Sequence, residues 1–238
     1  MCPACLAGAA GDFGFQDGDT HSLHSFWQRC GDFERLWATR AARTDPAWGR
    51  YYELGAIERE DMVEAEFWRL VHSAHEHVDV EYGADVHSTT HGHASPTMEE
   101  QPLNPYSRSG WNLNNMPILA GSLLRYIRAE ISGMTAPWIY IGMMFSAFCW
   151  HNEDHYTYSV NYQHMGATKT WYGVPGADAE AFEAAMQRIA PELFEACPDL
   201  LLQLITMMSP EIARREGVRV YAVNQRANEF VVTYPAAY

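Results

Sequence analysis

The sequence predicts a globular fold in which short β-strands are flanked by helices, and two observations support this class. Residues counted as hydrophobic make up 47% of the chain and charged residues 19%, the balance of a protein with a real core. Segments with helical spacing of apolar residues also alternate with segments rich in aromatic and β-favouring residues. At 238 residues the chain can form one large domain or two small ones.

The first half of the chain is predicted to hold two helices and a long loop. Apolar residues recur every three or four positions in residues 61–78 and 118–131, so they would share one face of a helix. This spacing predicts an amphipathic helix in each segment. Residues 83–110 are polar and interrupted by Pro and Gly, which predicts a long loop or insertion. This loop carries three histidines that could bind metal, although solvated side chains are the favoured interpretation: His87, His91 and His93.

The second half of the chain is predicted to hold strands, then helices, then a last strand. Residues 138–162 predict two or three strands and residues 169–175 predict another that stops at Gly and Pro. One helix has clear start and stop signals, with Ser209 as N-cap, Pro210 at its first position and Gly217 past its end. The other predicted elements are two helical segments and the last strand, at 182–193, 201–208 and 229–234.

Charge and cysteine content exclude some classes of protein. The formal net charge of -14 argues against binding nucleic acid through its phosphates. It suits a basic partner better, although an acidic surface that only keeps the protein soluble is the favoured interpretation. The longest apolar run, residues 136–150, falls short of the ~20 residues that a membrane-spanning helix needs. No signal peptide is visible in residues 1–14, and five cysteines without a regular framework indicate a reducing compartment, cytosol or nucleus.

The chemistry concentrates between His151 and Trp171. On a strand, His151 and Glu153 would point to one face, and a histidine with a carboxylate makes two-thirds of the facial triad that holds Fe(II). Alone this pattern is weak, and a zinc site on a helix would need a different spacing. For His155 and Asp154 a surface role is favoured over ligation.

Three polar residues stand in an otherwise apolar strand region. Lys169 must either extend its amine to water or meet an anion. Ser159 and Asn161 pose the same question, because their side chains could serve a ligand or simply satisfy backbone groups.

Several motifs of the chain belong together: FCWHNEDH at 148–155, YSVNY at 158–162, KTWYGVP at 169–175, EFWRLV at 66–71, VEYGAD at 80–85, GWNLNNMP at 110–117, APELF at 190–194 and NEFVVTYP at 228–235. Together they resemble the Jumonji-C family of Fe(II)- and 2-oxoglutarate-dependent oxygenases, in its histone H3 lysine-4 demethylase (JARID1-type) branch. The resemblance runs from about residue 13 to the end of the chain.

The resemblance implies a fold and a set of site residues. The fold would be mainly β with flanking helices, a double-stranded β-helix (cupin or jelly-roll type), truncated at its C-terminal edge. His151 and Glu153 would be iron ligands, and the third ligand, a histidine, would lie just beyond Tyr238. Contacts to 2-oxoglutarate are implied at Tyr82, Phe148, Ser159, Asn161 and Lys169, and Trp138 and Tyr140 resemble positions that line the substrate channel, although ordinary core aromatics are an equal alternative.

The domain organisation implied by the resemblance is that of a fragment. Cys2 and Cys5 resemble the end of a PHD-type zinc finger, so residues 1–5 would be its tail, 6–104 a linker and N-terminal helical or extended region, and 105–238 an incomplete oxygenase domain. Two departures from the family stand out: Ala167-Thr168 replace Glu-Pro before the lysine, and Asn228 replaces a glycine.

The function implied is oxidative removal of methyl groups from histone lysine, lysine 4 of histone H3 above all, in the nucleus. Fe(II) would be the cofactor, 2-oxoglutarate and O2 the co-substrates, and histone tails and chromatin complexes the partners, with zinc in the finger of the parent protein. The fragment alone would be inactive. One alternative is a Jumonji-C hydroxylase that acts on another protein. The other is a chromatin-binding scaffold without activity, and the joint presence of His151, Glu153 and Lys169 disfavours this scaffold.

Overall fold

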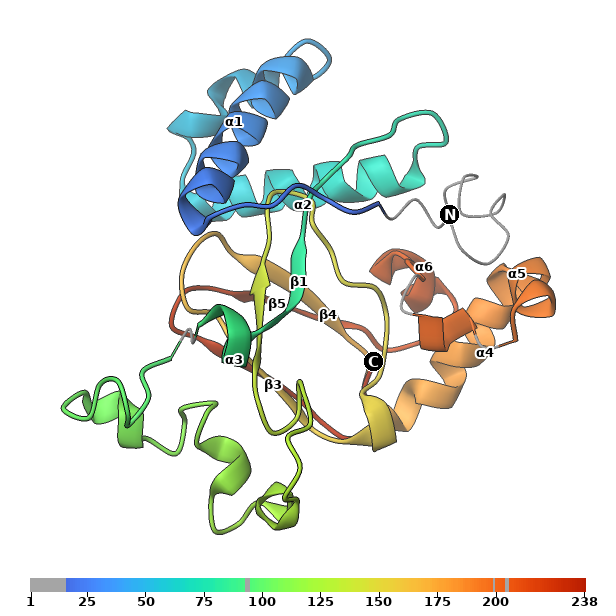
Figure 1. Ribbon diagram of the computed structural model, residues 1–238. Helices are drawn as coiled ribbons and strands as arrows, with labels where there is room; N and C mark the ends of the chain where they lie inside the picture. Colours follow the sequence, from blue (N-terminus) through green and yellow to red (C-terminus); the bar gives the residue numbers. More distant parts are fainter. Residues whose placement is uncertain (1–15, 93–94, 199, 204–205) are drawn as a thin grey trace. The chain divides into compact units, whose positions relative to one another are not determined.

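The structure, a computed structural model, describes residues 16–92, 95–198, 200–203 and 206–238. The chain forms two compact units, a larger one from residues 1–79 and 147–238 and a smaller one from residues 80–146. Figure 1 shows the elements of both units in chain order. The predicted zinc ligands Cys2 and Cys5 lie outside the described residues, and the predicted boundaries at residues 5 and 104 stay a prediction.

The smaller unit is built on one antiparallel strand pair. Strand β1 (Gly83–His87) pairs with β2 (Trp138–Ile141), and a short helix, α3 (Ser88–His91), follows β1. The prediction of a loop throughout residues 83–110 is therefore wrong at its start. Short 3-10 turns make up the remaining regular structure, at Pro105–Arg108 (η3), Met116–Ile118 (η4) and Leu123–Tyr126 (η5).

The helix predicted over residues 118–131 does not form. The Ser122 hydroxyl accepts a hydrogen bond from the Leu124 N–H and starts a separate 3-10 turn, so the local side chain competes with a continuous helix. Leu123, on the predicted apolar stripe, is 83% exposed. Most of a helix's stability comes from burying its apolar face, and this segment buries little of it.

Two long helices begin the larger unit. Helix α1 (Leu23–Ala41), which the sequence analysis missed, begins at a capping box between Ser22 and Ser25. Helix α2 (Ala56–His72) confirms the helix predicted over residues 61–78, although it begins and ends earlier. A 3-10 turn, η2 (Pro46–Glu53), lies between them.

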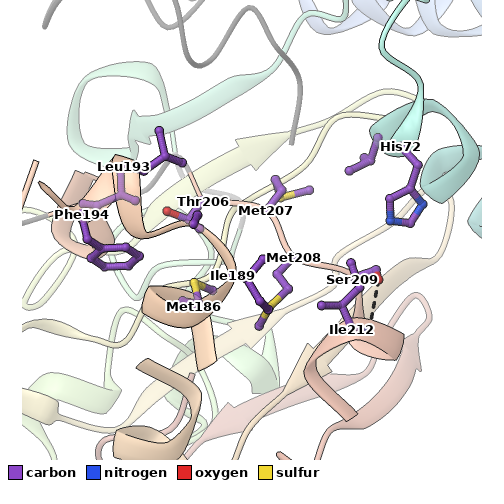
Figure 2. A pocket seen from close by; sticks show the side chains of 13 residues that line it. His72, Met186, Ile189, Leu193, Phe194, Thr206, Met207, Met208, Ser209 and Ile212 are labelled. Atoms are coloured by element: carbon purple, nitrogen blue, oxygen red, sulfur yellow. Dashed lines mark hydrogen bonds between the residues drawn. The ribbon is translucent and has the colours of Figure 1, made fainter. Parts of the chain in front are cut away.

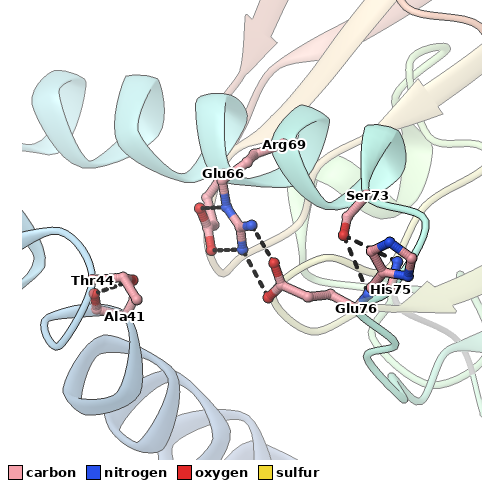
Figure 3. A network of polar contacts seen from close by, with 7 residues as sticks. All are labelled: Ala41, Thr44, Glu66, Arg69, Ser73, His75 and Glu76. Carbon is pink, nitrogen blue, oxygen red and sulfur yellow. Dashed lines mark hydrogen bonds and ion pairs between the residues drawn. The ribbon is translucent and has the colours of Figure 1, made fainter.

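An ion-pair network stabilises the segment that follows α2 (Figure 3). The Arg69 guanidinium donates two hydrogen bonds to the Glu66 carboxylate, at 2.8 and 2.9 Å, and also pairs with Glu76 beyond the end of the helix. The Ser73 hydroxyl accepts from the Glu76 N–H. The guanidinium therefore ties the chain that leaves α2 back to its last turns.

The described residues of the larger unit form two antiparallel strand pairs. Strand β3 (Ser159–Tyr162) pairs with β6 (Phe230–Thr233), and β4 (Lys169–Gly173) pairs with β5 (Tyr221–Gln225). The predicted strands in 138–162, at 169–175 and at 229–234 are confirmed by β2, β3, β4 and β6, whereas β5 was not predicted.

The helices after β4 enclose the core of the larger unit. The predicted helix 182–193 is two helices, α4 (Ala179–Ile189) and α5 (Pro191–Ala196), because Pro191 cannot continue α4 and instead begins the next helix. Helix α6 (Pro210–Arg215) confirms the predicted caps: Ser209 accepts from the Ile212 N–H and Gly217 has a φ of 85°. Of the predicted segment 201–208, the described part holds a short 3-10 turn, η8 (Leu200–Gln203).

The core packs around Phe182, whose side chain has no exposed surface. The rings of Trp150 and Tyr238 each lie 4.9 Å from the Phe182 ring, measured between centroids. Tyr238 also exchanges two backbone hydrogen bonds with Val174, at 2.8 and 3.0 Å. The last residue of the chain therefore packs against the end of β4. Among the described helices, none combines the length and apolar character that crossing a membrane requires.

Asn228 occupies a left-handed position between β5 and β6. Its φ is 70°, its N–H donates to the Gln163 carbonyl at 2.7 Å, and its side-chain oxygen accepts from the Tyr162 hydroxyl. Asn is one of the few non-glycine residues that adopt this conformation readily. The asparagine where the resembling family has glycine is thus compatible with the same turn.

We expect Asn228→Gly to change the free energy of unfolding little, because glycine also accepts a positive φ. Asn228→Val should lower it by about 1–2 kcal/mol, the cost of forcing a branched side chain into the left-handed region. Denaturant unfolding of the two variants and the wild type measures the difference, and equal stability of the Gly and Val variants would contradict the assignment.

Candidate functional site

His151 and Glu153 follow a firmly anchored tryptophan. Trp150 is 7% exposed, its indole N–H donates to the Met208 carbonyl at 2.8 Å, and its backbone N–H donates to the Thr206 carbonyl at 3.1 Å. The strand expected here is wrong: residues 151–153 have no regular structure and a 3-10 turn follows, η6 (Asp154–Tyr156). Anchoring by Trp150 rather than sheet pairing holds this segment.

The hydrogen bond of His151 determines which nitrogen can bind a metal. Nδ1 lies 2.8 Å from the Cys149 carbonyl oxygen, and because that oxygen can only accept, Nδ1 carries the proton of the bond. In the neutral ring, Nε2 then presents its lone pair. A histidine ligand whose other nitrogen donates to a backbone carbonyl is the usual arrangement around protein-bound metals.

No third ligand accompanies this pair within the described residues of the larger unit. No other His, Cys, Asp or Glu there joins both side chains in a group of three with ligand atoms within 4.8 Å. His155, a possible substitute, is exposed and has a φ of 56°. The described residues therefore add no third ligand to the His151 and Glu153 pair that the sequence predicts.

Lys169 begins β4 and is half-buried. Burial lowers the pKa of its ammonium, because a charge loses hydration there. Its Nζ lies 6.0 Å from the centroid of the Phe148 ring, which in turn packs on Trp171 at 4.6 Å. Of the 16 lysine and arginine residues in the chain, Lys169 is the only lysine. A partly desolvated cation beside an apolar ring is a suitable receptor for a small carboxylate.

Ser159 and Asn161 lie on β3 and differ in their partners. The Ser159 hydroxyl is within 2.6 Å of the Thr233 hydroxyl on the paired strand β6, so it has a partner in the protein. The Asn161 side-chain oxygen is buried without a hydrogen-bond partner. Buried polar atoms are nearly always satisfied, so this oxygen is suited to a donor supplied by a ligand or its water.

The three other predicted site residues lie together in the smaller unit. Trp138 and Tyr140 share one face of β2 and are 36% and 37% exposed, so they are not core aromatics. The Tyr140 hydroxyl donates to Asp85 at 2.8 Å, and its ring lies 6.1 Å from that of Tyr82. Burial, with a smaller contribution from Asp85, raises the pKa of Tyr82 to about 12, so its hydroxyl remains a donor at neutral pH.

Gln225, on β5, is a connecting residue that the sequence analysis missed. Its side chain is 1% exposed and directly opposes Lys169 across the strand pair. Its amide NH2 donates to the carbonyls of Asn161 and Glu229, both at 3.1 Å, and its oxygen accepts from the Trp171 indole at 2.8 Å. Gln225 thus joins the strands that carry Asn161 and Lys169. No local pattern marks it, because its partners lie far away in sequence.

A separate apolar cleft lies between α2 and the helices α4–α6 (Figure 2). Methionine and other apolar side chains line it, together with His72 from α2 and Ser209 from the cap of α6. None of the predicted site residues lines it, so the cleft is distinct from the candidate site.

Comparison with known proteins finds a family model that matches part of the chain. Residues 138–238 match the model of the JmjC domain, described as a hydroxylase. The match confirms the predicted fold class, with the strands as short two-stranded sheets.

Individual relatives resemble the whole chain. It is 45% identical over 247 aligned residues to human lysine-specific demethylase 5D and 44% identical to lysine-specific demethylase 5B of Gallus gallus, in each case across 100% of this chain. Identity to lysine-specific demethylase JMJ703 of rice is 43% across 95% of the chain. The chain spans 15% of the length of the first two relatives and 18% of the third.

The single lysine makes its ionisation directly measurable. In protein labelled with 13C-lysine, one Cε resonance should titrate below the ordinary lysine pKa near 10.4, because burial disfavours the ammonium. Adding 2-oxoglutarate should move this titration to higher pH, since a bound carboxylate favours the ammonium. By linkage, the affinity for 2-oxoglutarate should fall as pH rises through the pKa of the ligand-free protein. A titration that 2-oxoglutarate does not shift would exclude the contact.

Proposed function

We propose that this chain is part of an Fe(II)- and 2-oxoglutarate-dependent demethylase of histone lysine, acting above all on lysine 4 of histone H3. One observation carries the proposal: the only lysine of the chain lies half-buried on a strand beside Phe148, where a carboxylate can meet it. The JmjC match and the printed names of the relatives, lysine-specific demethylases, support the same reaction class.

The residues present fit iron in part. His151 would bind Fe(II) through Nε2, because its Nδ1 is engaged with the Cys149 carbonyl, and Glu153 would supply a carboxylate oxygen. When bound, the iron supplies the oxidising chemistry that amino-acid side chains lack. The buried Trp150 would hold both ligands in place by its bonds to Thr206 and Met208. The third protein ligand, a histidine beyond Tyr238, remains part of the proposal.

The residues on the strands fit 2-oxoglutarate. Lys169 would pair with the carboxylate remote from the metal, and Phe148 would pack against the methylene groups and keep water away. The Ser159 hydroxyl would donate a further hydrogen bond to the co-substrate, whereas the unpartnered Asn161 oxygen would accept from a water bound beside it, since 2-oxoglutarate offers no donor. The resemblance adds Tyr82 of the smaller unit, whose protonated hydroxyl would donate a further hydrogen bond.

The proposed substrate is a methylated lysine on a basic histone tail. The net charge of -14 favours a basic partner, and the exposed rings of Trp138 and Tyr140 offer surfaces on which a methylammonium group can rest. The proposal includes action in the nucleus, within chromatin complexes, and a zinc finger that ends in Cys2 and Cys5. Inactivity of the 238-residue chain alone also stays a prediction.

Replacing either metal ligand should abolish turnover. In a protein that extends beyond Tyr238, His151→Ala and Glu153→Ala should each stop formaldehyde release from a trimethyl-lysine histone H3 peptide, because the remaining ligands hold Fe(II) poorly. His155→Ala serves as the matched control and should keep activity. Full turnover in either ligand variant would contradict the assignment.

Lys169→Ala should raise the concentration of 2-oxoglutarate needed for half-maximal turnover while leaving iron binding largely intact. The expected loss in co-substrate affinity is on the order of 2–5 kcal/mol, the cost of removing one partner of a buried charged pair. Steady-state kinetics at varied 2-oxoglutarate, with iron content measured in parallel, tests this. An unchanged requirement would remove Lys169 from the site.

The same assays separate the alternatives. A hydroxylase acting on another protein would form succinate without formaldehyde. A scaffold without activity would form neither product, although it could still bind a histone peptide.

A further inference from the structure

Glu60 of α2 accepts hydrogen bonds from both sides of the β4–β5 pair. Its carboxylate accepts from the Thr168 hydroxyl at 2.6 Å, immediately before Lys169, and from the Asn224 amide at 3.2 Å. The Arg226 guanidinium binds it through two nitrogens, at 2.6 and 3.1 Å. Only 10% of the Glu60 side chain is exposed. We refer to Glu60, Thr168, Asn224 and Arg226 as the Glu60 clasp.

The clasp holds the strand pair from the face opposite to Lys169. Lys169 opposes Gln225, and Thr170 opposes Asn224, in the antiparallel register. Since side chains alternate between the two faces of a strand, Thr168 and Thr170 share one face and Lys169 takes the other. Asn224 of β5 and Arg226, the residue after β5, likewise flank Gln225. Glu60 therefore binds the side chains that flank the Lys169–Gln225 pair, on the opposite face of the strands.

Glu60 is held as a carboxylate. Burial by itself would raise its pKa, but the hydrogen bonds from Thr168 and Arg226 outweigh burial and hold the pKa of Glu60 below its usual value. The clasp is thus a charge-assisted network at neutral pH.

Thr168 gives this chain a contact that a proline could not make. The resembling family has Glu-Pro where this chain has Ala167-Thr168, and a proline restricts the backbone by its ring without any side-chain hydrogen bond. Thr168 lacks that restriction but supplies a hydroxyl, which Glu60 binds. No proline ring restricts the backbone before Lys169 in this chain, and the Thr168–Glu60 hydrogen bond connects it to α2 instead.

We propose that Glu60 is a positioning residue that aims Lys169 at the remote carboxylate of the co-substrate, acting through Thr168, Asn224 of β5 and Arg226 directly after it. This inference rests on the proposed function, in which Lys169 binds that carboxylate. Glu60 acts on the lysine only through the strand backbone, so its loss should weaken one specific contact rather than the whole site.

The experiment measures ligand affinity by calorimetry in a protein that extends beyond Tyr238. Two probes are titrated: 2-oxoglutarate, and 2-oxobutyrate, which is the same molecule without the remote carboxylate. Thr168→Val and Glu60→Gln should weaken binding of 2-oxoglutarate about tenfold, as loss of an outer hydrogen-bond partner commonly does, and leave 2-oxobutyrate unchanged. Thr168→Ser, which keeps the hydroxyl, should restore wild-type affinity.

Glu64→Gln is the matched control. Glu64 lies one turn further along α2 and accepts from the Tyr172 hydroxyl, at the far end of the same strand from Lys169. This variant can lower the thermal unfolding midpoint, but it should leave the affinity for 2-oxoglutarate unchanged. A loss of affinity in Glu64→Gln equal to that in Glu60→Gln would overturn the positioning role.

Two further outcomes separate this inference from the proposed function. Calorimetry on Lys169→Ala tests whether the lysine binds 2-oxoglutarate at all, and wild-type affinity there would overturn both proposals. If Lys169→Ala loses affinity while Thr168→Val and Glu60→Gln keep it, the Glu60 clasp alone is wrong. Because Thr168→Val removes one hydroxyl and no charge, it keeps the test valid if Glu60→Gln does not fold.

Discussion

The buried amide of Gln225 is the interaction on which the geometry of the strand region depends. It is 1% exposed and makes three hydrogen bonds, two as donor to backbone carbonyls and one as acceptor from Trp171. These bonds use its NH2 and its oxygen in the only orientation that suits all three partners. Since an unpaired buried amide is costly, β3 and β4 can hardly shift relative to β5 without losing stability. Of the residues proposed to bind 2-oxoglutarate, Ser159, Asn161 and Lys169 lie on the strands that this connection holds.

The two faces of the β4–β5 pair have different roles. One face carries Lys169 beside Phe148, where partial burial lowers the pKa of the ammonium. The other face carries the Glu60 clasp, in which the Glu60 carboxylate pairs with Arg226 and accepts from Thr168. The clasp supports the strands that carry this partly desolvated lysine. The metal ligands are held in a different way, because Trp150 fixes an irregular segment by burial and two backbone contacts.

Residues predicted from local patterns agree with the structure where local physics decides the outcome. The caps of α6 at Ser209 and Gly217 are short-range effects, and the strands around residues 159–162, 169–173 and 230–233 follow from aromatic and β-branched content. The prediction failed where contacts between residues far apart in the sequence decide the secondary structure. The apolar stripe at 118–131 has the right spacing but stays largely exposed, and β5 (Tyr221–Gln225) becomes a strand because β4 pairs with it.

The sequence by itself determined the chemistry available to the site: a histidine and a carboxylate two residues apart, one lysine in an apolar strand, and the motifs of the JmjC family. Only the tertiary structure decided how these groups are held. It assigned the Nδ1 proton of His151 to the Cys149 carbonyl, left the Asn161 oxygen without a protein partner, and brought Glu60 to Thr168 across 108 residues of chain. The physical reason is that a residue type fixes which bonds are possible, whereas burial and long-range pairing decide which of them form.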